Sequence, residues 1–297
     1  EAIPLIEKRI DASTDQKGKL EDLHRLASLF LDKLDDAERA RATYERILAF
    51  SRNDETALDR VERIDERSGR PERLLLTLER RAERTPASEK AALYQRMASI
   101  AETELSDLDR AAEYLGQAIE HAPEDENAIQ ALCDLLERDD RYEQLLELLQ
   151  ELAAREGQPQ RRVQLYARIA RLSAEWLGDE EGAAEAWQEV LQIREDVEAL
   201  QFLRNRAERQ DDPEQLAEIL KRMAALVSDA DQKRELLLEL GKLLYWQLDR
   251  FGDAVAVFRT ILDEIDPSCD AAVEEMLTAS EATGDRRDLA DALEGKL

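Results

Sequence analysis

The chain repeats itself every 71 or 72 residues. Small residues return at one position and bulky residues at another: Ala27, Ala98, Ala170 and Gly241, then Tyr44, Leu115, Trp187 and Phe258. A fixed period of this kind indicates a stacked architecture, in which each unit packs mainly on its two neighbours. The period therefore predicts a fold and a general kind of work, which is to present an extended surface to another molecule.

The composition favours helices along the whole chain. Only 10 Gly, 7 Pro and 5% aromatic residues occur among 297 residues, and 37% of the residues are charged. No stretch alternates apolar and polar residues as a half-buried strand would. The sequence therefore predicts an all-α fold.

Each period divides into four amphipathic segments. In the second period, apolar residues at helical spacing predict helices over residues 88–105, 108–122, 124–138 and 141–155. The prolines agree with this assignment. Pro71 and Pro213 open fourth helices, where the missing N–H costs nothing, and no proline falls within a predicted helix interior.

The period also predicts the organisation of the chain. We expect one solenoid over residues 1–297, with four double units that cover residues 17–86, 87–157, 158–228 and 229–297. Residues 1–16 resemble a fourth helix left over from a preceding unit. The last fourth helix still presents Leu289 and Leu293, whereas a solenoid usually ends in a polar capping unit. We therefore expect the sequence to be a segment of a longer array.

The helix pairs resemble tetratricopeptide repeats. The second period carries the resemblance best, through Tyr94, Met97, Ala98 and Ala101 on its first helix and Ala111, Leu115, Ala118 and Pro123 on and after its second. The resemblance implies a right-handed α-solenoid of stacked antiparallel helix pairs, a tetratricopeptide-like superhelix. It also implies a concave groove, lined by first helices, that binds a peptide or a protein. Leu34, Leu105, Leu177 and Leu248 depart from the family, which often has glycine near this position.

The resemblance places a set of polar residues in the groove. The first helices contribute His24, Ser28, Gln95, Ser99, Arg171 and Lys242, and the third helices contribute Gln130, Gln201 and Asn205. Some family members hold a terminal carboxylate with a lysine and an asparagine one turn apart. His24 with Ser28, and Gln95 with Ser99, stand at such positions instead. Recognition of chaperone C-termini is therefore not expected.

Two further features have a functional and a structural interpretation. Tyr245 and Trp246 form an aromatic pair that the period does not require. They could anchor a partner, or they could pack against the next helix pair. The dipeptides Glu66-Arg67, Glu137-Arg138 and Glu208-Arg209 recur at one repeat position. They could line the groove as a ladder of charge, but salt bridges between repeats are the favoured interpretation.

The net charge is -27, from 69 acidic and 42 basic residues. Such a field repels nucleic-acid phosphates and anionic lipid surfaces, so nucleic-acid binding is not expected. A basic peptide or protein segment is the more natural partner. The acidity could also serve only to keep a long surface soluble.

No motif indicates catalysis, a cofactor or a metal. His24 and His121 are the only histidines, and neither stands at ligand spacing from Cys133 or Cys269. No glycine-rich phosphate loop and no nucleophile elbow occur. No apolar stretch reaches the ~18 residues of a membrane span, so membrane insertion is not expected. The cytoplasm is the default location, with a periplasmic or secreted location left open.

These observations predict a non-catalytic scaffold for protein–protein interaction, with an acidic superhelical groove. Two alternatives stay open at this point. The chain could be a regulatory or sensor module of a larger multidomain protein, or it could be a structural array that assembles with itself.

Overall fold

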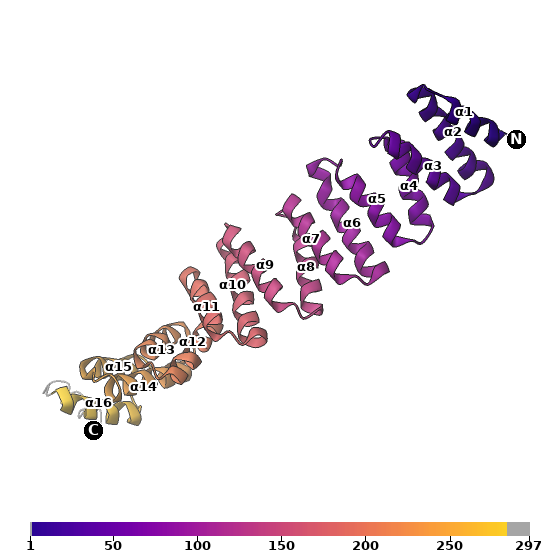
Figure 1. Cartoon of the computed structure of the whole chain (residues 1–297). Helices are drawn as coiled ribbons and strands as arrows, with labels where there is room; N and C mark the ends of the chain where they lie inside the picture. Colours follow the sequence, from indigo (N-terminus) through magenta and orange to yellow (C-terminus); the bar gives the residue numbers. More distant parts are fainter. Residues whose placement is uncertain (1, 284–297) are drawn as a thin grey trace. The chain divides into compact units, whose positions relative to one another are not determined.

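The computed structural model describes residues 2–283, and every regular element in that part is helical (Figure 1). The contacts divide the chain into two compact units, Glu1–Arg141 (unit 1) and Tyr142–Leu297 (unit 2). The predicted all-α fold of stacked helix pairs is confirmed within each unit. Leu289 and Leu293 lie outside the described residues.

Consecutive helices pack against each other as antiparallel neighbours within each unit. Unit 1 contains α1 (Ala2–Ala12), α2 (Gln16–Leu34), α3 (Ala37–Phe50), α4 (Glu55–Arg67), α5 (Pro71–Ala82), α6 (Ala87–Leu105), α7 (Leu108–His121) and α8 (Glu126–Arg138). Unit 2 contains α9 (Tyr142–Arg155), α10 (Pro159–Leu172), the π-helical turn η1 (Ser173–Leu177), α11 (Glu180–Ile193), α12 (Val197–Gln210), α13 (Pro213–Leu226), α14 (Ala230–Trp246), α15 (Phe251–Glu264) and α16 (Asp270–Thr283).

The predicted helix boundaries are confirmed. In the second period, α6 to α9 begin and end within two residues of the expected positions. The starts have a common chemistry, because aspartate side chains accept hydrogen bonds from backbone N–H groups of the first turn, as Asp54 does from Ala57. Pro71, Pro159 and Pro213 occupy the first turns of α5, α10 and α13. Local sequence therefore sets where many of the helices begin.

The turns repeat with the same period as the core. All residues with positive φ in the described part fall at two repeat positions: Asp35, Ser106, Gly178 and Asp249 at one, and Gly69, Asp140 and Asp211 at the other. At the first position, the residue that follows donates its N–H to a carbonyl six residues back, as Asp36 does to Phe30. This left-handed cap closes the helix and starts the next one. It follows directly after Leu34, Leu105, Leu177 and Leu248.

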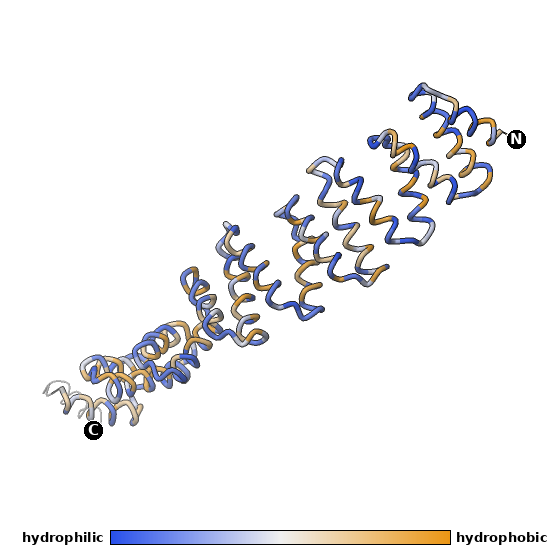
Figure 2. Tube along the Cα trace, viewed as in Figure 1, coloured by the Kyte–Doolittle hydropathy of each residue, from blue (hydrophilic) through white to orange (hydrophobic). Residues whose placement is uncertain are grey.

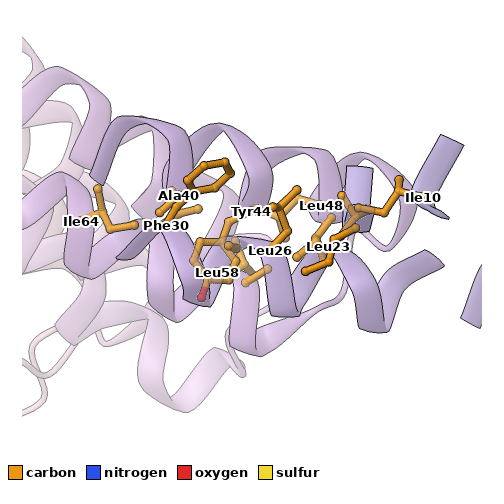
Figure 3. Close-up of a cluster of buried hydrophobic side chains, with 14 residues drawn as sticks. Ile10, Leu23, Leu26, Phe30, Ala40, Tyr44, Leu48, Leu58 and Ile64 are labelled. Atoms are coloured by element: carbon orange, nitrogen blue, oxygen red, sulfur yellow. The ribbon is translucent and has the colours of Figure 1, made fainter. Parts of the chain in front are cut away.

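Apolar and polar residues alternate along the helices (Figure 2), and most of the apolar ones are buried. In unit 1, the cluster drawn in Figure 3 joins α1 to α4 through residues that are less than one tenth exposed, among them Ile10, Leu23 and Tyr44. The small position of the period lets neighbouring helices approach. At Gly241, a Cβ atom would lie 2.4 Å from Cε1 of Phe258, so even alanine does not fit without movement. The predicted pairing of small and bulky positions thus has a steric basis.

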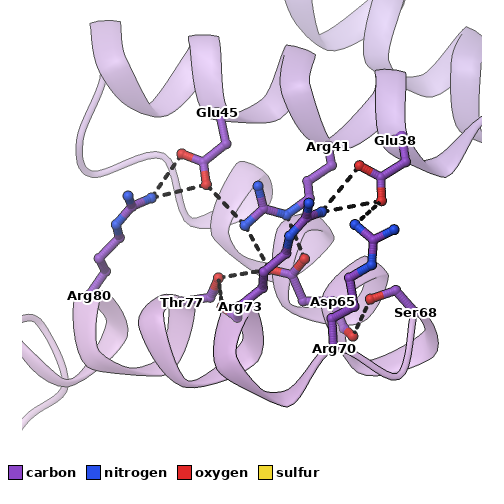
Figure 4. Close-up of polar contacts among 9 residues, drawn as sticks. All are labelled: Glu38, Arg41, Glu45, Asp65, Ser68, Arg70, Arg73, Thr77 and Arg80. Carbon is purple, nitrogen blue, oxygen red and sulfur yellow. Dashed lines mark hydrogen bonds and ion pairs between the residues drawn. The ribbon is translucent and has the colours of Figure 1, made fainter.

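One polar cluster interrupts the apolar core of unit 1 (Figure 4). The Asp65 carboxylate, with a fully buried side chain, accepts hydrogen bonds from Nε of Arg41 at 2.5 Å and from Oγ1 of Thr77 at 2.9 Å. The second period has Ala112, Leu136 and Leu148 at the three equivalent positions. Arg41, Asp65 and Thr77 therefore form a buried triad that the architecture itself does not need.

A charge-reversed ion pair joins successive repeats. Between α4 and α6, Glu62 pairs with Arg96 at 2.6 Å. At the equivalent positions between α12 and α14, Arg204 pairs with Glu239 at 2.8 Å. Both positions of the pair have changed sign, so the two charges stay opposite, as a direct contact between repeats requires.

Replacing Gly69 tests the left-handed turns. Its φ is +61° and no atom lies near the added Cβ, so any cost is conformational. We expect Gly69→Ala to lower the free energy of unfolding by about 1 kcal/mol. Gly69→Asp should cost less, because aspartate occupies the equivalent positions 140 and 211. Urea titration followed by circular dichroism measures both. Equal losses for the two variants would contradict the explanation.

The buried triad gives a second stability test. Arg41→Ala leaves the Asp65 carboxylate buried without its cation, so we expect a loss of about 3 kcal/mol. The triple variant R41A/D65L/T77L copies the second period and should unfold within about 1 kcal/mol of the parent, or be more stable. Urea titration compares the two variants. A triple variant as unstable as Arg41→Ala would show that the triad is required for folding.

Candidate functional site

A shallow hollow of about 640 Å³ opens between α6 and α8 of unit 1. Glu102 of α6 lines one side, and α8 contributes Ala131, Asp134, Glu137 and Arg138. Carboxylates outnumber the guanidinium three to one. We call these five residues the acidic hollow.

The helix period explains why these α8 residues share a face. Ala131, Asp134 and Arg138 follow one another at spacings of three and four residues, as neighbours on one helix face do. The opposite stripe of α8, which includes Leu132 and Leu135, is buried. The small side chain at position 131 leaves the room that the hollow occupies. A rigid packed helix therefore positions the carboxylates.

Hydrogen bonds arrange the charges in the acidic hollow. Nη2 of Arg138 donates to Oε1 of Glu102 at 2.5 Å, and this bond raises the pKa of the guanidinium above its ordinary value. The only cation of the hollow is thus already matched to one of its carboxylates. Nε2 of Gln130 donates to Oδ1 of Asp134 at 2.6 Å. The Gln130 amide carries no charge, so this hydrogen bond does not neutralise the carboxylate. Three carboxylates and one guanidinium line the hollow, so its lining is acidic.

Two residues predicted to line the groove contact aspartates that cap helices of the same chain. His24 Nε2 lies 2.8 Å from Oδ2 of Asp54, and Nε2 of Gln95 donates to Oδ2 of Asp125 at 2.5 Å. Asp54 and Asp125 are the N-caps of α4 and α8. His24 and Gln95 stand at equivalent repeat positions, so the same link between helices is made twice with different chemistry.

Of the other residues of unit 1 that were predicted to line the groove, two lie on α6 and α8, the helices of the acidic hollow, and one lies on α2. Ser99 is exposed on α6, three residues before Glu102, and Gln130 is exposed on α8 beside Asp134. Each of these two residues thus lies one helical turn from a residue that lines the acidic hollow. Ser28 is half-buried on α2.

The predicted cations of unit 2 are held in ion pairs. Arg171 binds Glu198 through two hydrogen bonds of 2.7 and 2.5 Å, and its guanidinium lies 5.8 Å from the ring centre of the buried Trp187. The bond from Arg171 holds the pKa of the Glu198 carboxyl below its ordinary value. Lys242 Nζ lies 3.4 Å from Glu275.

Unit 2 also exposes polar amides and aromatic rings. Gln201 and Asn205 are exposed on α12. Trp246 is 64% exposed, whereas Tyr245 is half-buried beside it. Trp176, which is 60% exposed in η1, was not among the predicted site residues. One signal in the sequence could have identified Trp176: the other periods have Lys33, Glu104 and Gln247 at this position, and none of these is aromatic.

The recurrent Glu-Arg dipeptides form salt bridges, in line with the favoured interpretation. Arg138 pairs with Glu102, Glu66 pairs with Arg96 at 3.0 Å, and Arg209 pairs with Glu180 at 3.0 Å. Each pair joins different helices. These side chains therefore link the repeats to one another.

Residues 2–283 contain no group of three or more His, Cys, Asp or Glu side chains arranged to hold a metal ion. Among the helices in this part of the chain, none combines the length and the apolar character that a membrane-spanning helix needs.

The chain is similar to solved structures of helical repeat proteins. No family model and no curated protein sequence matches it. The C-terminal part of a TPR repeat-containing protein from Cytophaga hutchinsonii is 14% identical, with a TM-score of 0.35 over 85% of this chain and 99% of that one. YrrB, described as a TPR protein with an unusual peptide-binding site, is 17% identical, with a TM-score of 0.31 over 65% of this chain and 94% of its own.

A third similarity is to a chain in the structure of Naa15/Naa10 bound to HypK-THB. It is 17% identical, with a TM-score of 0.41, and the match covers 93% of this chain and 41% of that one. Identities and scores at this level say nothing of function. The function has to be inferred from this chain's own residues.

Gln95 tests whether the cap contact is structural. We expect Gln95→Ala to lower the free energy of unfolding by about 1 kcal/mol, because the contact with the α8 cap is lost. Gln95→His should retain most of the stability, since His24 makes the equivalent contact in the first period. Thermal unfolding followed by circular dichroism compares the two. If both variants unfold like the parent, Gln95 has no structural role and becomes available for binding a partner.

Proposed function

We propose that the chain is a non-catalytic scaffold for protein–protein interaction, and that the acidic hollow binds a basic peptide segment. The observation that carries the proposal is the excess of carboxylates in the hollow. Glu102, Asp134 and Glu137 line it, while its one cation, Arg138, is already bonded to Glu102. An arginine or lysine side chain from a partner would add a second cation to a hollow lined by three carboxylates.

The surroundings of the hollow support a peptide as the partner. The hollow is open and shallow, so it suits one or two side chains of a larger molecule. Its carboxylates stand on packed helices, which lowers the entropy lost when a partner binds. The net charge of -27 adds a long-range attraction for cations that speeds encounter.

The two histidines support a scaffold over a catalyst. His24 contacts the α4 cap, Asp54, and lies edge-on to Tyr44 with 6.2 Å between the ring centres. His121 stacks on Tyr94 at 5.7 Å. Both imidazoles thus take part in packing between helices, and neither belongs to the acidic hollow.

Neutralising the hollow tests the proposal. We expect D134N/E137Q to raise the Kd for a dye-labelled arginine–serine peptide about tenfold, which corresponds to about 1.4 kcal/mol. The variant E72Q/E120Q removes two exposed carboxylates from α5 and α7 and serves as the matched control. Fluorescence anisotropy at low and physiological salt measures both variants.

The control separates a site from a general field. If only the hollow variant loses affinity, and its binding depends less on salt than that of the parent, the hollow is the site. If both variants lose the same affinity, the peptide responds to net charge alone and the proposed site is wrong.

A further inference from the structure

One end of unit 2 carries two clusters of aromatic side chains. At this end α10 with η1, α12 and α14 finish, and α11, α13 and α15 begin, because consecutive helices are antiparallel. We call the residues of the two clusters the aromatic edge: Tyr142, Trp176, Tyr245, Trp246 and Phe251.

The first cluster is built on a π-helical turn. Trp176 lies in η1, is 60% exposed, and stacks on Tyr142 with 4.7 Å between ring centres and 23° between planes. Turns of this type are rare and occur frequently at functional sites. The period requires no ring here, because its equivalent residues are Lys33, Glu104 and Gln247.

The second cluster follows one period later, three residues before the next left-handed turn. Trp246 is 64% exposed and meets Tyr245 edge-on at 4.6 Å, and Tyr245 meets Phe251 edge-on at 5.2 Å. Both clusters therefore combine a ring from the end of one helix with a ring from the start of a helix packed nearby. Half-buried rings contact the exposed tryptophans.

Ion pairs join the helix ends between the clusters. Arg209 at the end of α12 pairs with Glu180 at 3.0 Å, and Arg250 before α15 pairs with Glu214 at 3.3 Å. The arginines along this end are thus neutralised. Glu175, next to Trp176, interacts electrostatically with Arg171, a cation that already binds Glu198 through two hydrogen bonds. Asp249 lies in the left-handed turn that follows Trp246. The edge thus presents apolar rings beside the carboxylates of Glu175 and Asp249.

We propose that the aromatic edge is a second interaction surface, which binds an amphipathic peptide with bulky apolar and basic side chains. Exposed tryptophans supported by other rings are the side chains that most often anchor a protein interface. Their apolar faces fit leucine-sized groups, and Glu175 and Asp249 fit adjacent lysines or arginines. Unit 1 has no equivalent cluster, because Asp32, Thr103 and Glu104 occupy the corresponding positions. This surface is separate from the acidic hollow.

The test uses the full chain with the hollow neutralised by D134N/E137Q, so that binding there does not mask the edge. The probe is a dye-labelled peptide of leucine and lysine at helical spacing, with a lysine–serine peptide of the same charge as comparison. We expect W176A/W246A in this background to raise the Kd for the leucine–lysine peptide at least tenfold. Leu34→Ala, at an apolar position in unit 1 that is 54% exposed, is the matched control.

Tryptophan fluorescence gives a readout that does not depend on any substitution. Of the three tryptophans, Trp187 is 2% exposed, so acrylamide quenching reports mainly on Trp176 and Trp246. Leucine–lysine peptide should reduce this quenching, and lysine–serine peptide should not.

The outcomes separate the two surfaces. Binding that survives D134N/E137Q and is lost on W176A/W246A supports the aromatic edge, whatever happens at the acidic hollow. The proposal is overturned if the tryptophan variant binds the leucine–lysine peptide within twofold of its parent, or if quenching does not change on binding. Loss of all binding on D134N/E137Q alone would also overturn it.

Discussion

The close contact between a small residue on one helix and a bulky residue on the next is the constraint on which the structure depends. At Gly241 and Phe258 the approach excludes even a methyl group. The same pairing recurs each period, and the left-handed turns recur with it. Because core and turns fix the helix positions, the exposed residues are free to differ between units. The acidic hollow and the aromatic edge are two such differences.

Comparison of the periods shows what each contact requires. Glu62–Arg96 and Arg204–Glu239 occupy equivalent positions, but the acidic and basic residues are exchanged. The contact between repeats therefore needs two opposite charges, and either helix can carry the positive one. The buried triad around Asp65 shows the reverse, since apolar residues replace it in the next period. A buried ionic cluster often contributes little net stability compared with apolar residues of similar volume. We infer that it distinguishes the first period from the others.

Much of the fold could be predicted from the sequence, because helix starts depend on local aspartates and prolines and the core depends on the period. The candidate site was harder to predict from the sequence. His24 and Gln95 have the position and polarity of groove residues, yet each binds the cap of a helix 30 residues further along the chain. Periodicity does not reveal such a contact. Trp176 was not predicted as a site residue. The period predicts where the neighbouring residues lie, but it does not predict that the Trp176 ring in η1 is exposed.

The central claim is that non-repeating residues on a repeating core bind the partner. Carbodiimide cross-linking of the arginine–serine peptide, made with a single added lysine, tests this directly, because it joins a carboxylate to an amine only where they touch. We predict that mass spectrometry will locate the cross-links mainly at Glu102, Asp134 and Glu137. Cross-links spread over the exposed carboxylates of both units in proportion to their number would contradict the account.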